Sequence, residues 1–86
     1  MCNGWSNRST WLVNLILDND QDLYLCRLDE LEELTAPVTM RDARRIANGL
    51  GISQRLLKEG QAKAGDVNWF EIADAWEDER KEMDNV

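Results

Sequence analysis

Histidine is missing from the 86-residue sequence, and cysteine occurs only twice, at Cys2 and Cys26. Histidine is the side chain that most often acts as a general acid or base, and it is one of the usual zinc ligands. Two cysteines alone do not complete a zinc site, and no motif places a base beside either thiol. The sequence therefore predicts a protein that is not an enzyme and that binds no metal or other cofactor. Both cysteines are expected to be free thiols in a reducing compartment.

Long apolar runs are missing as well. The longest, residues 11–17, is interrupted by Asn14 and is far shorter than the roughly 20 residues that cross a bilayer as a helix. The N-terminal residues lack the apolar core of a signal peptide. We therefore expect a cytoplasmic protein that makes no contact with a membrane.

Alternating strand patterns are nearly absent, whereas apolar residues make up 43% of the chain and include four tryptophans. A chain of this length forms one modest core. We predict an all-α fold, a compact single domain of four to five short helices over residues 1–86. The ends of this domain, residues 1–5 and 82–86, are expected to fray.

Capping residues and apolar spacing place the first two helices. The first is expected over the apolar residues 11–17, with Trp5 packed on its first turn. Four residues are candidates for its N-cap, of which Ser6 or Ser9 can accept the first free backbone N–H groups: Ser6, Asn7, Ser9 and Thr10. Trp5 and Trp11 are both assigned to the core, since large aromatic side chains beside an apolar helix usually cover it. A second helix is expected to end before Pro37.

Three further helices follow the proline. The third is expected to begin at Thr39, which can form a capping box with Asp42, and the fourth at Ser53. The last is expected to begin at Asn68, with Glu71 three residues later. Its buried face has spacings of three and four residues: Trp69, Ile72, Ala73 and Trp76.

The formal net charge is −7, and it is unevenly distributed along the chain. Residues 18–38 sum to −6, residues 39–65 to +4 and residues 66–86 to −6. The two acidic segments coincide with the second and the last expected helix. A row of carboxylates on a rigid helix can imitate nucleic-acid phosphates and bind a basic groove, with strong salt dependence.

Eight carboxylates of these two helices are the candidate partner-binding residues: Asp29, Glu30, Glu32, Glu33, Asp74, Glu77, Asp78 and Glu82. Like charges one turn apart, such as Asp74 and Asp78, cost a few tenths of a kcal/mol in an isolated helix. A function in binding would explain why the chain keeps them. The alternative is an acidic surface that serves solubility alone.

The basic central segment contains "RRIANGLGISQRLLKE", residues 44–59, which resembles the helix-turn-helix of phage-type repressors. Small Ala47 permits a close helix crossing, and Gly51 permits the tight turn. Three residues would then face DNA: Gln54, Arg55 and Lys58. Gly60 stands where the motif usually has an apolar anchor, and the acidic flanks would repel phosphate. The simpler interpretation is a corner between two packed helices.

A calcium loop is a weaker alternative. Asp18, Asp20 and Asp22 have the alternating spacing of EF-hand ligands, and Asp29 falls at the twelfth position. However, Leu23 occupies the sixth position, where the sharp turn requires glycine. We therefore favour a solvated turn between two helices.

The opening stretch "NGWSNRSTWLVNLILDND", residues 3–20, resembles a family of small proteins, without an established activity, carried by bacteriophages, plasmids and related mobile elements. The late stretch "VNWFEIADAW", residues 67–76, is similar to the closing helix of that family. Ser9 is a departure, since the family often has glutamate there. The matching residues of the opening are Asn3, Gly4, Trp5, Ser6, Asn7, Thr10, Trp11 and Asp18 to Asp20.

This resemblance implies a mobile-element setting, in which small acidic proteins such as anti-CRISPR and antirestriction proteins block host defence complexes. We therefore expect an inhibitor that acts in the host cytoplasm. Its acidic surfaces would bind a CRISPR effector or a restriction enzyme and exclude nucleic acid, without touching nucleic acid itself. The alternatives are a small helix-turn-helix-like DNA-binding regulator and a structural or host-takeover phage protein.

Overall fold

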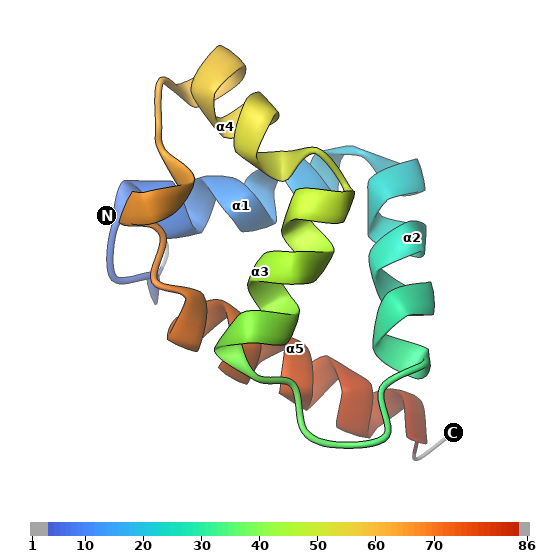
Figure 1. Cartoon of the computed structure of the whole chain (residues 1–86). Helices are drawn as coiled ribbons and strands as arrows, with labels where there is room; N and C mark the ends of the chain where they lie inside the picture. Colours follow the sequence, from blue (N-terminus) through green and yellow to red (C-terminus); the bar gives the residue numbers. More distant parts are fainter. Residues whose placement is uncertain (1–3, 85–86) are drawn as a thin grey trace.

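The computed structural model describes residues 4–84, which form five α-helices and no strand (Figure 1). The helices are α1 (Arg8–Asn19), α2 (Gln21–Glu32), α3 (Met40–Gly49), α4 (Ile52–Gly60) and α5 (Trp69–Asp84), with a 3-10 turn, η2, at Ala64–Asp66. The predicted all-α class is thus confirmed. Of the ends expected to fray, residues 1–3 and 85–86 lie outside the described residues, and α5 continues as far as Asp84.

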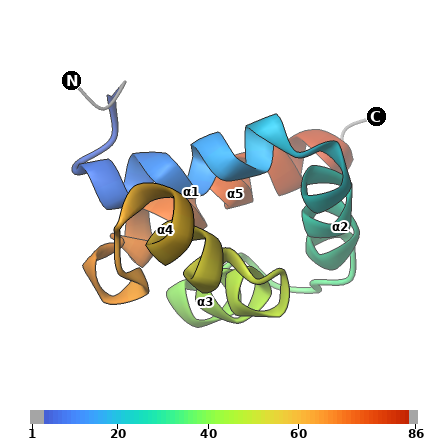
Figure 2. The same ribbon diagram turned by 90° about the horizontal axis from the view of Figure 1, so that it is seen from above.

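The helices pack into a body of 36 × 24 × 21 Å. The most extensive contacts are those of α3 with α5 and of α1 with α4. Seen from above, α3 and α4 lie on one side of the molecule and α1 and α5 on the other (Figure 2). Helix α2 closes one end and touches α1, α3 and α5.

Side-chain caps fix where most helices begin. The N-cap of α1 is Asn7, whose Oδ1 accepts the Thr10 N–H at 2.9 Å. Ser9 lies inside the first turn of α1, and the Ser6 hydroxyl accepts a bond from Asn68 Nδ2 at 3.4 Å instead. Of the four candidate caps, Asn7 is the one that the helix uses, and neither Ser6 nor Ser9 caps it, because the chain remains extended as far as Asn7.

The capping box of α3 is confirmed, with Thr39 and Asp42 exchanging bonds of 3.1 Å. The N-cap of α4 lies two residues earlier than expected, at Gly51, whose φ of +73° favours glycine. Ser53 does not cap α4. Its hydroxyl donates to Asn48 Oδ1 at 2.8 Å, which joins α4 to the end of α3.

All five helices contribute to one core. The largest fully buried apolar side chains are Trp76, Leu17, Leu31, Ile52, Leu56, Ile72 and Val13. Trp5 and Trp11 are half-buried and pack against this core, as expected for aromatic residues beside an apolar helix. The predicted buried face of α5, including Trp69 and Trp76, is confirmed.

Gly60 is buried at the end of α4, where α1 passes close to its backbone. A Cβ atom at this position would lie 2.5 Å from Leu12 Cδ1, so any larger residue would displace that side chain. The usual apolar anchor of a helix-turn-helix is thus replaced by Leu12 of α1, which packs against the glycine itself.

Arg27 of α2 is the one buried cation of the described residues, with 2% of the residue exposed. Its Nη2 forms an ion pair with Glu79 of α5 at 2.9 Å, and its guanidinium carbon lies 5.1 Å and 5.2 Å from the ring centres of Tyr24 and Trp76. Nε and Nη1 have no hydrogen-bond partner within residues 4–84. Cation–π stacking on the two rings therefore supplies much of the free energy that offsets the loss of water around the buried guanidinium.

Substitution of Arg27 separates the contribution of packing from that of charge. Arg27→Ala leaves a cavity between α2 and α5 and should lower the free energy of unfolding by about 2–5 kcal/mol. Arg27→Met fills most of that space without an unpaired donor, and its stability should stay within about 1.5 kcal/mol of the parent or exceed it. Urea denaturation followed by circular dichroism measures both. Equal loss in the two variants would show that the core depends on the ion pair rather than on packing.

Candidate functional site

The acidic residues predicted on α2 lie mostly on the side that faces away from the core. Asp29, Glu32 and Glu33 are exposed, and none of them forms an ion pair with another residue between positions 4 and 84. Glu30 is half-buried, and its Oε2 lies 3.6 Å from Nη1 of Arg45 on α3. Three of the four carboxylates on this helix are thus open to a partner.

The outer face of α5 carries Asp74, Asp78 and Glu82 at intervals of four residues, which places them on one side of the helix. All three are exposed and have no ion-pair partner in the described part of the chain. Their like charges, one turn apart, repel one another. This row is the most regular array of free carboxylates on the molecule.

Glu77 has a different role from its predicted one, because it holds the loop before α3. Its Oε1 accepts the Val38 N–H at 3.1 Å, and both of its oxygens accept bonds from Arg80, at 2.7 Å and 3.1 Å. These bonds, first that of the Arg80 guanidinium and then that of the Val38 N–H, lower the pKa of Glu77 to about 2. The charge of Glu77 is therefore used inside the protein.

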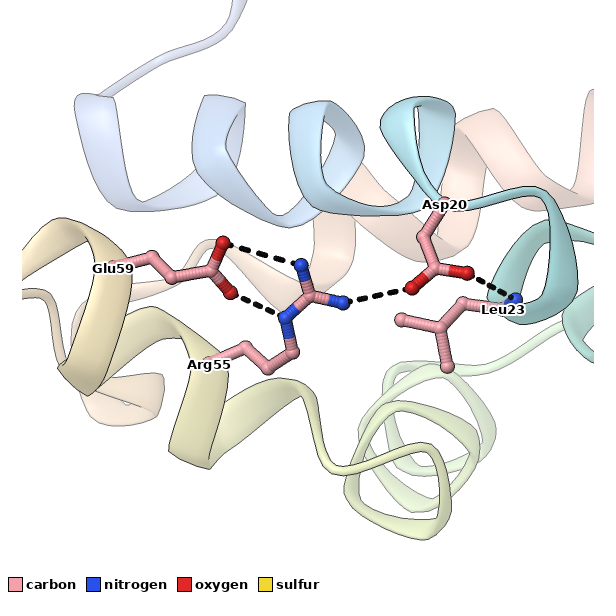
Figure 3. A network of polar contacts seen from close by, with 4 residues as sticks. All are labelled: Asp20, Leu23, Arg55 and Glu59. Carbon is pink, nitrogen blue, oxygen red and sulfur yellow. Dashed lines mark hydrogen bonds and ion pairs between the residues drawn. The ribbon is translucent and has the colours of Figure 1, made fainter.

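The predicted corner between two helices is present in the basic segment, where α3 and α4 meet at Gly51. Gln54 and Lys58 are exposed on α4, as a DNA-binding helix requires. Arg55, the third predicted DNA contact, is instead held by two carboxylates (Figure 3). Its Nη1 donates to Asp20 Oδ2 at 3.0 Å, and its Nε and Nη2 bind the carboxylate of Glu59.

The pKa values of these three groups follow from the network in Figure 3. Bonding to Glu59 and then to Asp20 raises the pKa of Arg55, and the Arg55 guanidinium lowers that of Glu59. The pKa of Asp20 is lowered first by the Leu23 N–H, which it caps at 3.2 Å, and then by Arg55. Arg55 thus links α4 to the start of α2, and its use on DNA would require this link to break.

The calcium loop, considered as the weaker alternative, does not form. Residues 18–29 belong to the end of α1 and to α2, with Asp20 as the single non-helical residue between them. The Asp20 carboxylate caps α2 by accepting the Leu23 N–H, and its other oxygen accepts a bond from Arg55. Within residues 4–84, no three His, Cys, Asp or Glu side chains are placed to hold a metal ion. The short polar break is a helix junction.

The opening motif joins the start of α1 to the start of α5. The Thr10 hydroxyl, fully buried, donates to Asn7 Oδ1 at 2.7 Å and accepts the Asn68 N–H at 2.8 Å. Asn68 Oδ1 in turn caps α5 by accepting the Glu71 N–H at 3.1 Å, as predicted. Glu71 then accepts the Ser6 N–H at 2.9 Å. We call these five residues the N-terminal clasp; its polar residues are used in folding.

Four large apolar side chains are exposed in the described part of the chain, and none was among the predicted site residues: Leu25, Met40, Leu57 and Phe70. Two of them, Met40 and Phe70, are 51% and 66% exposed and line the same hollow between α3 and α5. The sequence contains a signal for Phe70: once Trp69, Ile72 and Trp76 form the buried face, Phe70 must lie outside that face. Its proximity to Met40 depends on how α3 packs on α5, and the sequence pattern does not predict that packing.

Comparison of the chain with known protein families, curated proteins and solved structures gives no significant match. Within the described range, no helix is long and apolar enough to cross a membrane. Cys26 is an exposed free thiol on α2, whereas Cys2 lies outside the described residues.

The N-terminal clasp can be tested by removing one oxygen. Thr10→Val keeps the size of the side chain but leaves the Asn68 N–H without an acceptor, which should lower the free energy of unfolding by about 1–3 kcal/mol. Ser9→Ala, at the residue just before Thr10, should change the free energy of unfolding by less than about 0.5 kcal/mol. Denaturant unfolding compares the two. Equal stability of Thr10→Val and the parent would show that the clasp is not a structural element.

The low pKa of Glu77 predicts an acid-sensitive contribution to stability. Its pKa is about 2 in the folded chain and 4.5 in the reference state, so this contribution is complete above the reference pKa and is lost as the pH falls towards 2. Glu77→Gln should flatten the decline of stability in that window and lower stability at neutral pH. Urea midpoints from pH 7 down to pH 2.5 measure this effect. Parallel curves for the two proteins would contradict the assignment.

Proposed function

We propose that this protein is an inhibitor made by a phage or a related mobile element. It binds a basic surface of a host defence complex, a CRISPR interference complex or a restriction enzyme, and prevents nucleic acid from occupying that surface. The proposal combines the acidic faces of α2 and α5 with the resemblance of the opening motif to mobile-element proteins. The protein acts in the host cytoplasm and needs no catalytic group or cofactor.

The observation that carries this proposal is the separation of paired from unpaired charge. Six of the eight predicted carboxylates make no ion pair within residues 4–84: Asp29, Glu32, Glu33, Asp74, Asp78 and Glu82. The other two, Glu30 and Glu77, are paired with arginines of the same chain. Five of the six stand on α2 or α5, and Glu33 is the C-cap of α2, so the helix backbone fixes their spacing.

Such an array supports binding to a protein surface that has evolved to hold phosphates. Repulsion between free carboxylates is relieved when cations of a partner approach them, and the field of the array speeds their encounter. Binding of this kind weakens steeply as salt is added, because screening acts on exposed charges. A nucleic-acid channel lined by lysine and arginine is a complementary partner.

The DNA-binding alternative has one observation in its favour and one against it. The corner of α3 and α4 exists, and it leaves Gln54 and Lys58 exposed. Arg55 is bound by Asp20 and Glu59, so two carboxylates lie where this helix would approach phosphate. We therefore rank this function second, and the same experiment separates the two.

Charge reversal on the acidic faces tests the proposed inhibition. In cells that carry a CRISPR interference system and are infected by a targeted phage, the parent protein should restore plaque formation. Glu32→Lys with Glu33→Lys, or Asp74→Lys with Asp78→Lys, should abolish this protection. On the purified complex, each pair should weaken inhibition of DNA binding about tenfold or more, equivalent to about 1.4 kcal/mol.

The control for net charge is Asp18→Lys with Asp66→Lys, which alters the total equally at exposed positions outside both faces. Gln54→Ala with Lys58→Ala tests the alternative, and neither of these residues holds the fold by a side-chain bond between described residues. Loss of activity in the Gln54 and Lys58 pair, with both acidic pairs active, would favour a DNA-binding regulator. Equal loss in the Asp18 and Asp66 control would indicate a nonspecific effect of charge.

A further inference from the structure

A groove between the start of α3 and α5 gathers two of the large apolar side chains that the fold leaves exposed. Met40 and Phe70 lie on its walls, and its volume is about 410 Å³, within the range of about 300–1,000 Å³ usual for binding clefts. We call it the α3/α5 groove. It is lined by Pro37, Val38, Thr39, Met40, Phe70, Ala73, Asp74 and Glu77.

The α3/α5 groove is built by contacts that hold its walls in place. Val38 and Ala73 are buried at its base, and Pro37 restricts the loop that leads to α3. Glu77 fixes the same loop by accepting the Val38 N–H, and Arg80 holds Glu77. A partner that enters the groove would therefore meet a largely preformed surface and lose little free energy in ordering it.

The charge along the groove is of one sign. Asp74 lines it without an ion-pair partner in the described chain, and no lysine or arginine is among its lining residues. On the other side of Asp74 lies a second hollow, of about 350 Å³, which is lined by Gly4, Trp5, Glu71, Asp74, Ala75 and Asp78. Its lining residues in the described chain likewise include acidic and aromatic side chains and no lysine or arginine. An occupant of this face must combine apolar side chains with positive charge.

We propose that the α3/α5 groove takes a large apolar side chain from a partner protein, presented on an amphipathic segment whose lysines or arginines flank that side chain. Met40 and Phe70 contact the apolar side chain, and Asp74 and Asp78 pair with the flanking cations. This inference rests on the proposed function, since it names the contact by which the acidic face of α5 holds its target. It adds that apolar anchoring, besides charge, determines the affinity.

A synthetic helical peptide, with leucines on one face and lysines on the other, is the probe. Backbone amide chemical shifts of the labelled full chain are followed as the peptide is added. The largest changes should fall on residues 37–40 and 70–78. A matched peptide with serine in place of leucine should bind about tenfold more weakly or worse, and one with glutamate in place of lysine should not bind.

Variants of the groove separate anchoring from charge. Phe70→Ser and Met40→Ser should each weaken peptide binding about tenfold, because exposed anchors carry most of the affinity. Asp74→Asn should weaken it and reduce its salt dependence while leaving the apolar wall intact. Leu57→Ser is the matched control, since Leu57 is 61% exposed on α4 and does not line the groove; it should change binding by less than about twofold.

Equal binding of the serine and leucine peptides, or shifts centred away from the groove, would overturn the inference. The proposed inhibition would survive that result if the charge-reversal pairs still abolished protection. Self-association of the chain without peptide, removed by Phe70→Ser, would assign the groove to a second copy and also overturn the partner proposed here. Conversely, peptide binding at the groove with no protection in infected cells would uphold the groove and contradict the defence target.

Discussion

Ion pairs and hydrogen bonds of three arginines connect segments that are distant in the sequence. Arg27 ties α2 to α5, Arg55 ties α4 to the start of α2, and Arg8 donates to the Gly60 carbonyl at 2.7 Å and so ties α1 to the end of α4. Each of these arginines is used inside the fold, although the chain has only ten basic residues for seventeen acidic ones. The fold therefore leaves six carboxylates of α2, its C-cap and α5 without an ion-pair partner among the described residues.

This distribution of charge gives the two sides of α5 different properties. Its inner side is apolar and contains Trp69 and Trp76, whereas its outer side has free carboxylates beside exposed Phe70. Repulsion among the carboxylates costs stability in the free protein, and a cationic partner would relieve that cost. An apolar anchor in the α3/α5 groove would add affinity that salt does not screen. Together, charge provides rapid encounter, and the groove provides the position of the contact.

Local signals in the sequence predicted much of the fold. The capping box of Thr39 and Asp42, the Asn68 cap and the spacing of the buried residues in α5 depend only on neighbours three or four residues away. The burial of Arg27 could not be predicted in this way, because an arginine in an acidic helix normally points to water. Its environment is created by Trp76, which approaches it only when α5 packs on α2.

The same limit applies to the candidate site. The free carboxylates of α2 and α5 follow from helix periodicity, but the pairing of Glu77 with the Val38 N–H depends on a contact across 39 residues. Likewise, the helix-turn-helix pattern predicts Arg55 as a DNA contact, but its bond to Asp20, 35 residues away in the sequence, depends on how α4 packs against the start of α2. Met40 and Phe70 meet only through the packing of α3 on α5. Long-range contacts therefore decide which charged residues are available and which are used in folding.

The most direct test is affinity capture of the tagged full chain from a host lysate that contains a CRISPR interference complex. The beads are washed at low and then at high salt, and each eluate is assayed for protein and for DNA. The account predicts that the subunits of the complex bind at low salt and leave the beads at high salt. Recovery of DNA without any protein partner would contradict it and would move the binding function to the corner of α3 and α4.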